Sequence, residues 1–259
     1  MVTVLTIAGS DSGGGAGIQA DLRTFAAHHV FGTTAITAIT AQNTIGIRQI
    51  LALPPAIVVD QIEAVLADFH VEAVKIGMLV NEPIVRAVAE TLRRHRPKHV
   101  VLDPIIRSSS GTDLLDHAGV DAMRTQLLPL ADVVTPNLSE AEVLSGVPVK
   151  SLADARVAAA HLIVRGARAV VITGGHLEGD PSDLVHNGRE ITVLEGTRLD
   201  TSHTHGTGCT FASALAARLA LGDAVIDAAR AAKLYVARAI AQAPHLGRGR
   251  GPLEHFPQG

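Results

Sequence analysis

The sequence has a single cysteine, Cys209, among its 259 residues. One cysteine cannot form an intrachain disulfide, and no CxxC pair or paired His and Cys spacing indicates a structural zinc site. Basic residues are not in excess either, because 22 lysines and arginines against 25 aspartates and glutamates give a formal net charge of -3. They are scattered, so no basic face is expected to neutralise the phosphates of a nucleic acid. The sequence therefore predicts neither a disulfide framework nor a nucleic-acid partner.

Long apolar runs are also absent. Glycine, proline or charged residues interrupt the apolar stretches well before the roughly 20 residues that a helix needs to cross a bilayer. The first residues, MVTVLTIAGSDSGGG, lack a basic leader and lead into a glycine loop, which is typical of a first strand rather than of a signal peptide. We therefore expect a cytoplasmic protein with no membrane partner.

Short β-branched runs alternate with longer segments of helical period. Such alternation favours a mostly parallel sheet covered by helices. Because 47% of the residues are hydrophobic and no repeat, long linker or composition shift divides the chain, we expect one domain over residues 1–259. The expected strands cover residues 3–9, 33–40, 73–79, 99–105, 131–137 and 169–175, and the expected helices cover residues 16–29, 54–69, 81–95, 207–222 and 225–242.

The pattern changes after Gly175. Turn residues at Asn187-Gly188 and Glu195-Gly196 bracket a segment of period two, which predicts an antiparallel hairpin that completes the sheet. In open sheets of this kind ligands bind beyond the carboxyl ends of the strands. The unusual residues of this sequence gather after the expected strands, so we expect the functional site there.

The motif HTHGTGCTFAS, residues 203–213, places two glycines before an expected helix. The backbone N–H groups of Gly206, Thr207, Gly208 and Cys209 would then be free to bind an anion such as a phosphate. Cys209 would lie in the first helical turn, where the thiol pKa is expected to fall and make a usable general base. The alternative is that Gly-Thr-Gly only turns the chain and Cys209 fills a gap in the core.

A second glycine cluster, SDSGGGAGIQADLRTF, follows the first strand. It matches neither a P-loop nor a dinucleotide fingerprint, but its backbone could approach a flat ligand. Asp11 would either accept hydrogen bonds in the site or serve as a cap or turn residue. After the second strand, the Gln42 amide could read a donor and an acceptor on a heterocycle edge, and Met78 could form an apolar wall or belong to the core.

Two carboxylates follow later strands. Glu140 lies three residues after Asn137 at an expected helix start and suits a Mg²⁺ site, although a capping interaction with Asn137 would also explain it. Asp103 directly follows a buried strand, either at the mouth of the site or as a buried, partnered carboxylate. Phosphoryl transfer requires a divalent ion that draws charge off the phosphates, and Glu140 is the candidate ligand for it.

The motifs SDSGGGAGIQADLRTF, TAITAQNT, KIGML, VLDPII, TPNLSEAEVL, ITGGH and THGTGCTFAS, in this order, resemble the hydroxymethylpyrimidine/phosphomethylpyrimidine kinases of thiamine biosynthesis over nearly the whole chain. The resemblance implies a ribokinase-like three-layer α/β/α fold with a mostly parallel central sheet. It also implies two successive phosphorylations with MgATP, of 4-amino-5-hydroxymethyl-2-methylpyrimidine and then of its monophosphate. The family commonly forms homodimers, so a homodimer is expected here.

The resemblance assigns roles to individual residues. Cys209 would be the base, Gly206 to Gly208 the anion hole, and Gln42 a contact to the pyrimidine. Further pocket positions would be Ala16 and Met78, and the metal and phosphate side would involve Glu140 and Asp103.

Two positions depart from the family's pattern. The glycine loop has Ser12 where the family often has proline, and Thr173 stands where a lysine is common. If that lysine holds ATP phosphates, another cation must compensate, and Arg107 is the candidate.

Two rival functions share the fold. One is a pyridoxal kinase of the same superfamily, although some thiamine-type kinases that act on pyridoxal use a second cysteine on a lid, and this chain has only Cys209. The other is a catalytically silent pyrimidine- or phosphate-binding regulator. The presence of Cys209 and Glu140 argues against it.

Overall fold

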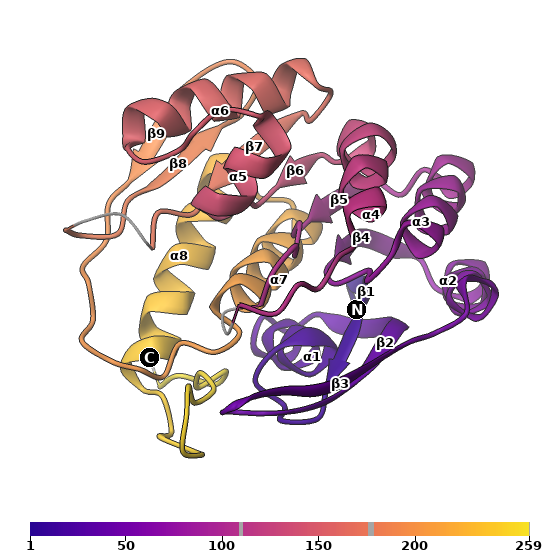
Figure 1. Cartoon of the computed structure of the whole chain (residues 1–259), viewed down its shortest axis with the longest axis horizontal. Helices are drawn as coiled ribbons and strands as arrows, with labels where there is room; N and C mark the ends of the chain where they lie inside the picture. The colour runs from indigo at the N-terminus through magenta and orange to yellow at the C-terminus, as the bar shows by residue number, and fades with distance from the viewer. Residues whose placement is uncertain (109–110, 176–178, 259) are drawn as a thin grey trace.

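The computed structural model describes residues 1–108, 111–175 and 179–258. His176, the last residue of the ITGGH motif, lies outside the described residues. Among the described residues, nine strands form one sheet in the order β3-β2-β1-β4-β5-β6-β7-β8-β9 (Figure 1). The strands are β1 (Thr3–Asp11), β2 (Phe31–Asn43), β3 (Gly46–Ala52), β4 (Val71–Ile76), β5 (His99–Leu102), β6 (Val133–Val134), β7 (Ala169–Ile172), β8 (Asp183–His186) and β9 (Ile191–Leu194).

The middle of the sheet is parallel and its two edges are antiparallel. Neighbours from β2 through β1, β4, β5 and β6 to β7 run parallel. At one edge β3 pairs antiparallel with β2, and at the other β8 and β9 form the expected antiparallel hairpin. The predicted mostly parallel sheet with a terminal hairpin is therefore confirmed, whereas strand β3 was not predicted.

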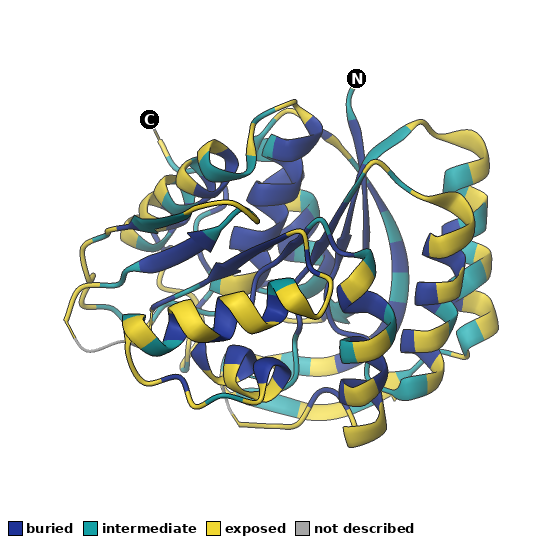
Figure 2. Ribbon diagram, turned by 90° about the horizontal axis from the view of Figure 1, so that it is seen from above, coloured by how far each residue is buried: buried dark blue, intermediate teal, exposed yellow. Residues whose placement is uncertain are grey.

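Helices cover both faces of the sheet, so the predicted three-layer α/β/α arrangement is confirmed (Figures 1 and 2). One face packs against α2 to α6, and the other against α1, α7 and α8. The helices are α1 (Gly17–Ala27), α2 (Pro55–Asp68), α3 (Glu82–His95), α4 (His117–Ala122), α5 (Leu138–Ser145), α6 (Leu152–Val164), α7 (Thr207–Ala220) and α8 (Val225–Ala241). After α4 the chain continues through a π turn, Met123–Leu127, and a 3₁₀ turn, Leu128–Leu130.

The apolar sequence of the central strands follows from their burial on both faces. Alternate residues of β1 belong to different cores: Leu5 and Ile7 face the α2 to α6 layer, whereas Val4 faces the α7 and α8 layer. Helix α7 is buried over most of its length because it lies between the sheet and its helical neighbours α1 and α8. Its alanine-rich sequence lets these elements approach closely. Helix α7 is thereby held firmly with its N-terminus at the carboxyl ends of the strands.

No helix among the described residues is long and apolar enough to span a membrane. The predicted single domain over residues 1–259 stays a prediction, although the sheet continues from β1 near the N-terminus to β9 without a break.

Candidate active site

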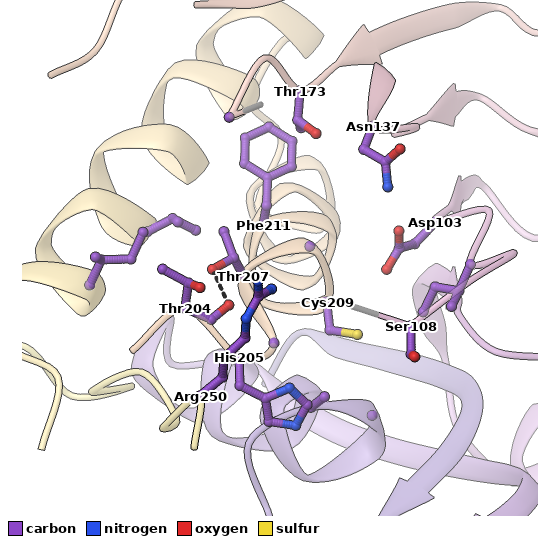
Figure 3. Close-up of a pocket in the computed structure, with 18 of the residues that line it drawn as sticks. Asp103, Ser108, Asn137, Thr173, Thr204, His205, Thr207, Cys209, Phe211 and Arg250 are labelled. Atoms are coloured by element: carbon purple, nitrogen blue, oxygen red, sulfur yellow. Dashed lines mark hydrogen bonds between the residues drawn. The ribbon is translucent and has the colours of Figure 1, made fainter. Parts of the chain in front are cut away.

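A large cavity opens at the carboxyl ends of the parallel strands, where the sequence predicted the site. Its walls come from the segments that follow β1, β2, β4, β5, β6 and β7, and from the N-terminus of α7 (Figure 3). All ten residues that the sequence singled out for the site line this cavity: Asp11, Ala16, Gln42, Met78, Asp103, Glu140, Gly206, Thr207, Gly208 and Cys209.

Asp11 organises the glycine loop between β1 and α1. Its buried carboxylate accepts hydrogen bonds from the backbone N–H groups of Gly13 at 2.8 Å, Gly15 at 3.1 Å and Ala16 at 2.9 Å. Burial would raise the pKa of Asp11, but the hydrogen bonds from His205 and from the loop amides lower it below its usual value. These bonds show the turn role that the sequence allowed, and a direct contact between Asp11 and a substrate stays a prediction.

His205 connects the glycine loop to the segment before α7. Its Nε2 lies 2.9 Å from Asp11 Oδ2 and 3.3 Å from the side-chain amide nitrogen of Gln42. An ionised carboxylate can only accept, so Nε2 donates its proton to Asp11. The Gln42 amide nitrogen is also a donor, so its approach to Nε2 is a close contact and not a hydrogen bond. Sequence reasoning missed His205 although it belongs to the HTHGTGC motif. Its contacts explain why Gln42, from the end of β2, lies beside the glycine loop.

The N-terminus of α7 is held against the glycine loop. Gly206, the cap of the helix, has φ 83°, and a side chain there would collide with the carbonyl of Gly15. Glycine is therefore needed both for the left-handed conformation and for the close approach. The Thr207 hydroxyl donates to the Thr204 carbonyl at 2.8 Å, a bond drawn in Figure 3. The Thr207 N–H also donates to the Thr204 carbonyl, at 3.4 Å, so the expectation that it is free is wrong. Among the described residues, the N–H groups of Gly206, Gly208 and Cys209 have no backbone acceptor and suit an anion.

Cys209 lies in the first turn of α7, as predicted, but its pKa moves the other way. Burial raises the pKa of the thiol to about 12, although the charge of Lys75 lowers it and the negative charge of Asp103 raises it further. The expectation that the helix N-terminus brings the thiol pKa toward neutrality is therefore wrong for this structure. The reason is that only 7% of the residue is exposed, so that desolvation of the thiolate outweighs the helix dipole.

A set of polar groups that sequence reasoning missed lies beneath Cys209. The Lys75 ammonium donates to the two oxygens of Asp21 at 3.0 and 3.1 Å, and Asp21 also accepts from the hydroxyls of Thr6 and Ser213, each at 2.6 Å. Ser213 lies one helical turn after Cys209 on the same face of α7. These four groups are closed to solvent, and Asp103, which lines the cavity, lies next to them. We call the five residues the buried charge cluster: Thr6, Asp21, Lys75, Asp103 and Ser213. A lysine within the otherwise apolar β4 was the available sequence signal.

Asp103 belongs to this cluster but lacks a full set of partners. Its carboxylate is 4% exposed and lies 3.8 Å from the Lys75 ammonium. Among the described residues, none donates a hydrogen bond to Asp103 Oδ2. Burial raises the pKa of Asp103 to about 6, and the charge of Lys75 opposes that shift. Asp103 thus lines the cavity, as one sequence interpretation had it, and is also buried, as the other had it, but its partnership is incomplete.

Glu140 forms the capping interaction that the sequence offered as an alternative. Asn137 Oδ1 accepts from the Glu140 N–H at 3.0 Å, and Glu140 Oε2 accepts from the Asn137 N–H at 2.9 Å. Burial raises the pKa of Glu140 to about 8, and the nearby charge of Asp103 raises it as well. Two buried carboxyl groups that disfavour each other's charge, one with an unpartnered oxygen, fit a divalent cation between them. Among the described residues no group of three or more His, Cys, Asp or Glu side chains forms a metal site, and Mg²⁺ typically needs only one or two carboxylates.

Arg107 does not take the position that the sequence suggested for it. Its guanidinium donates to Asp113 at 2.8 Å, and both side chains are largely exposed at the rim of the cavity. Thr173 lines the cavity after β7 and brings no charge. The hypothesis that Arg107 replaces a lysine at position 173 therefore finds no support in its contacts.

The comparisons by sequence and by structure each match this chain over nearly its whole length. The family model described as phosphomethylpyrimidine kinase matches residues 11–254. A hydroxymethylpyrimidine/phosphomethylpyrimidine kinase of Synechococcus elongatus is 47% identical and the match covers 97% of this chain and 96% of that protein. The thiamine biosynthesis bifunctional protein ThiED of Geobacter sulfurreducens is 46% identical over 98% of this chain, which spans 52% of that longer protein. The ADP complex of Bacillus subtilis pyridoxal kinase superposes with a TM-score of 0.92 and 39% identity, and covers 99% of this chain and 98% of that one.

Proposed function

This chain belongs to the phosphomethylpyrimidine kinase family, and we propose that it transfers the terminal phosphoryl group of ATP to hydroxymethylpyrimidine and then to the resulting monophosphate. It is a phosphotransferase of thiamine biosynthesis, with the ribokinase-like fold of its relatives. One observation supports the proposal most directly: His205, in the segment that leads into α7, donates to Asp11 of the glycine loop and lies against Gln42, so the proposed acceptor end of the cavity is next to the proposed anion-binding turn. Acceptor and phosphate would therefore meet at Cys209.

The acceptor end suits a flat heterocycle. Gln42 offers an amide to the ring edge, Met78 offers an apolar wall, and Ala16 leaves room because its side chain is small. The nucleotide would occupy the other end of the cavity, where Leu199, Val236 and Ile240 give an apolar lining for a base. The relative with bound ADP supports ATP as the phosphoryl donor.

Positioning and electrostatics would provide most of the rate acceleration. The N–H groups of Gly206 and Gly208 would face the transferring phosphoryl group, and Cys209 would take the proton of the hydroxymethyl group. The raised pKa of Cys209 makes the thiolate scarce, while the buried Lys75 favours it. In a largely dissociative transition state the hydroxyl becomes strongly acidic only as its bond to phosphorus forms, so a late proton transfer is sufficient.

Mg²⁺ would be held by Asp103 and Glu140. When bound, it would draw negative charge off the phosphates. Its charge would also favour the ionised forms of these two carboxyl groups, which burial disfavours in the protein alone.

We also propose a homodimer in the cytoplasm, where ATP is available. Ile39 and Leu51 are opposite each other on β2 and β3 and are 49% and 58% exposed, and the nearby Ile45 is 69% exposed. An apolar patch on an edge hairpin is a suitable contact surface for a second copy of the chain. Size-exclusion chromatography with light scattering tests this state, and a monomer at micromolar concentration would contradict it.

The proposed activity is tested by offering hydroxymethylpyrimidine, its monophosphate and pyridoxal separately with MgATP, and by identifying products by mass spectrometry. We expect the monophosphate from the first acceptor and the diphosphate from the second. Pyridoxal phosphate as the main product would instead support pyridoxal kinase, the activity of the Bacillus subtilis structure. No ATP turnover with any acceptor would favour a pyrimidine-binding regulator.

A further inference from the structure

The C-terminal segment of residues 247–251 has the sequence Gly-Arg-Gly-Arg-Gly and borders the active-site cavity, although the proposed function does not use it. We call it the tail loop. It passes two segments of the site. On one side is Thr44, two residues after Gln42, and on the other is the loop that holds His205 and leads into α7.

Backbone hydrogen bonds fix the tail loop at both contacts. The N–H of Gly249 donates to the Thr44 hydroxyl at 3.2 Å, and the N–H of Arg250 donates to the Thr44 carbonyl at 2.9 Å. At the other contact the N–H of His205 donates to the Gly251 carbonyl at 3.1 Å. Arg250 therefore lies between the acceptor end of the cavity and its phosphate end.

The glycines of the tail loop are required by its close packing. A Cβ atom on Gly249 would collide with the Thr44 carbonyl, and one on Gly251 would collide with the His203 imidazole. Such contacts leave no room for another residue type. The glycine-rich sequence is thus fitted to the site rather than a loose terminal linker, and the side chains that it carries there are those of Arg248 and Arg250.

Arg250 is available for a ligand. Its side chain is exposed and lines the cavity, and Figure 3 shows its guanidinium directed toward Thr204 and Thr207 at the entry to α7. Among the residues that the structure describes, none forms an ion pair or a hydrogen bond with this guanidinium. Arg107 differs, because Asp113 already engages it. An arginine without a protein partner beside an anion-binding turn is suited to a phosphate.

We propose that Arg250 binds the phosphate group of the monophosphate acceptor and so determines the efficiency of the second phosphoryl transfer. This inference rests on the proposed function. The acceptor of the first transfer is a neutral alcohol, whereas the acceptor of the second carries close to two negative charges near neutral pH. Only the second reaction therefore brings extra negative charge to the boundary where Arg250 lies. A cation at this position attracts the phosphate group of the monophosphate, whereas the neutral alcohol has no charge for it to attract.

The test is steady-state kinetics of Arg250→Gln, with each acceptor varied at saturating MgATP and with MgATP varied at saturating acceptor, and with product formation followed by mass spectrometry. We expect kcat/KM for the monophosphate to fall at least about tenfold more than kcat/KM for the alcohol, since a hydrogen bond to a charged group commonly changes affinity by this factor. Arg250→Lys, which keeps the charge but not the planar fork, should lie between the wild type and Arg250→Gln.

Arg107→Gln is the matched control, because it removes a second arginine from the cavity rim that is already paired. Any change in kcat/KM that Arg107→Gln causes should be the same factor for both acceptors. Equal losses for both acceptors in Arg250→Gln, a selective loss in Arg107→Gln, or a raised KM for ATP with both acceptors in Arg250→Gln would each overturn the inference. Failure of the proposed function is distinguishable, because the wild type would then form no diphosphate at all.

Salt dependence gives an independent measure. Exposed charges are screened at high ionic strength, so salt should lower the preference of the wild type for the monophosphate over the alcohol. The same ratio in Arg250→Gln should change much less. An equal change in both proteins would contradict a phosphate contact by Arg250.

Discussion

The buried charge cluster lies beneath the active-site cavity, and we call it the floor; Arg107 and Asp113 lie at the rim of the cavity. Both places contain a charged pair, but in opposite surroundings. On the floor, Lys75 and Asp21 are closed to solvent and bonded to each other. On the rim, Arg107 and Asp113 form a pair of similar length with side chains that are 65% and 70% exposed. Burial decides the consequence: a charge without its partner is costly on the floor and readily hydrated on the rim. Removing a floor charge should therefore affect folding, and removing a rim charge should affect at most binding.

Replacement of Lys75 should have the largest effect. In Lys75→Met the floor keeps the Asp21 and Asp103 carboxylates but loses the cation between them. Loss of one partner of a buried pair typically costs about 3–5 kcal/mol of unfolding free energy. Chemical denaturation should show this loss. The double variant Lys75→Met with Asp21→Asn should recover part of it, because fewer uncompensated charges remain buried. A loss under about 1 kcal/mol would mean that the floor behaves like the rim.

Cys209 lies just above the floor and is not part of the Lys75–Asp21 pair. Its replacement should therefore lower activity without the large loss of unfolding free energy expected for Lys75→Met. In Cys209→Ala, kcat/KM for the first transfer should fall by about 10²–10⁴, the usual contribution of a general base. The second transfer should fall less, because a phosphate acceptor is already largely ionised. Parallel assays with the two acceptors measure the difference, and Cys209→Ser controls for the lost volume. Equal losses in both steps would contradict a role of Cys209 as the base.

Replacement of Glu140 should have a smaller effect than replacement of Cys209. Glu140→Gln should remove part of the pH dependence of the unfolding free energy. Burial raises the pKa of Glu140 from its ordinary value to about 8. A carboxyl group with a raised pKa stabilises the folded state fully below its unfolded pKa, and this stabilisation is lost as pH rises toward 8. The slope is at most about 1.4 kcal/mol per pH unit. Glutamine can keep the capping contact without titrating.

Unfolding free energies of both proteins at several pH values between 5 and 8 measure this difference. The wild type should lose stability relative to Glu140→Gln as the pH rises. Parallel pH profiles would show that Glu140 ionises at its ordinary pKa, as a group on the rim would.

The sequence predicted the parallel middle of the sheet and the positions of the site residues because these depend on local signals. Apolar strands followed by polar residues mark the carboxyl edge of a sheet, and Asp11 and Asp103, which follow such strands in the sequence, line the cavity there. Cys209 also lines the cavity, and the signal for it was the pair of glycines before α7. Strand β3 was missed. Its residues are mostly exposed or half-buried, since it is the edge of the sheet, and only weak alternation marks it.

The floor could not be predicted from the sequence. Lys75, Asp21 and Ser213 come from three elements far apart in the chain, and only the fold brings them together. The prediction of a lowered pKa for Cys209 was wrong for the same reason. The position of Cys209 at the helix start was visible in the sequence, but the burial that raises its pKa was not. The contacts of the tail loop with Thr44 and His205 also depend on tertiary packing.

Replacement of Arg107 should have the smallest effect. Both partners of its pair are mostly exposed, and such pairs contribute about 0–1 kcal/mol because water solvates either charge alone and salt screens the pair. We therefore expect Arg107→Gln to change the unfolding free energy by less than about 1 kcal/mol, and by less still at high salt. Chemical denaturation at low and high ionic strength measures both values. A loss as large as that of Lys75→Met would mean that the rim pair is buried in the working protein, for instance beneath a second copy of the chain, and the contrast between floor and rim would then apply only to the monomer.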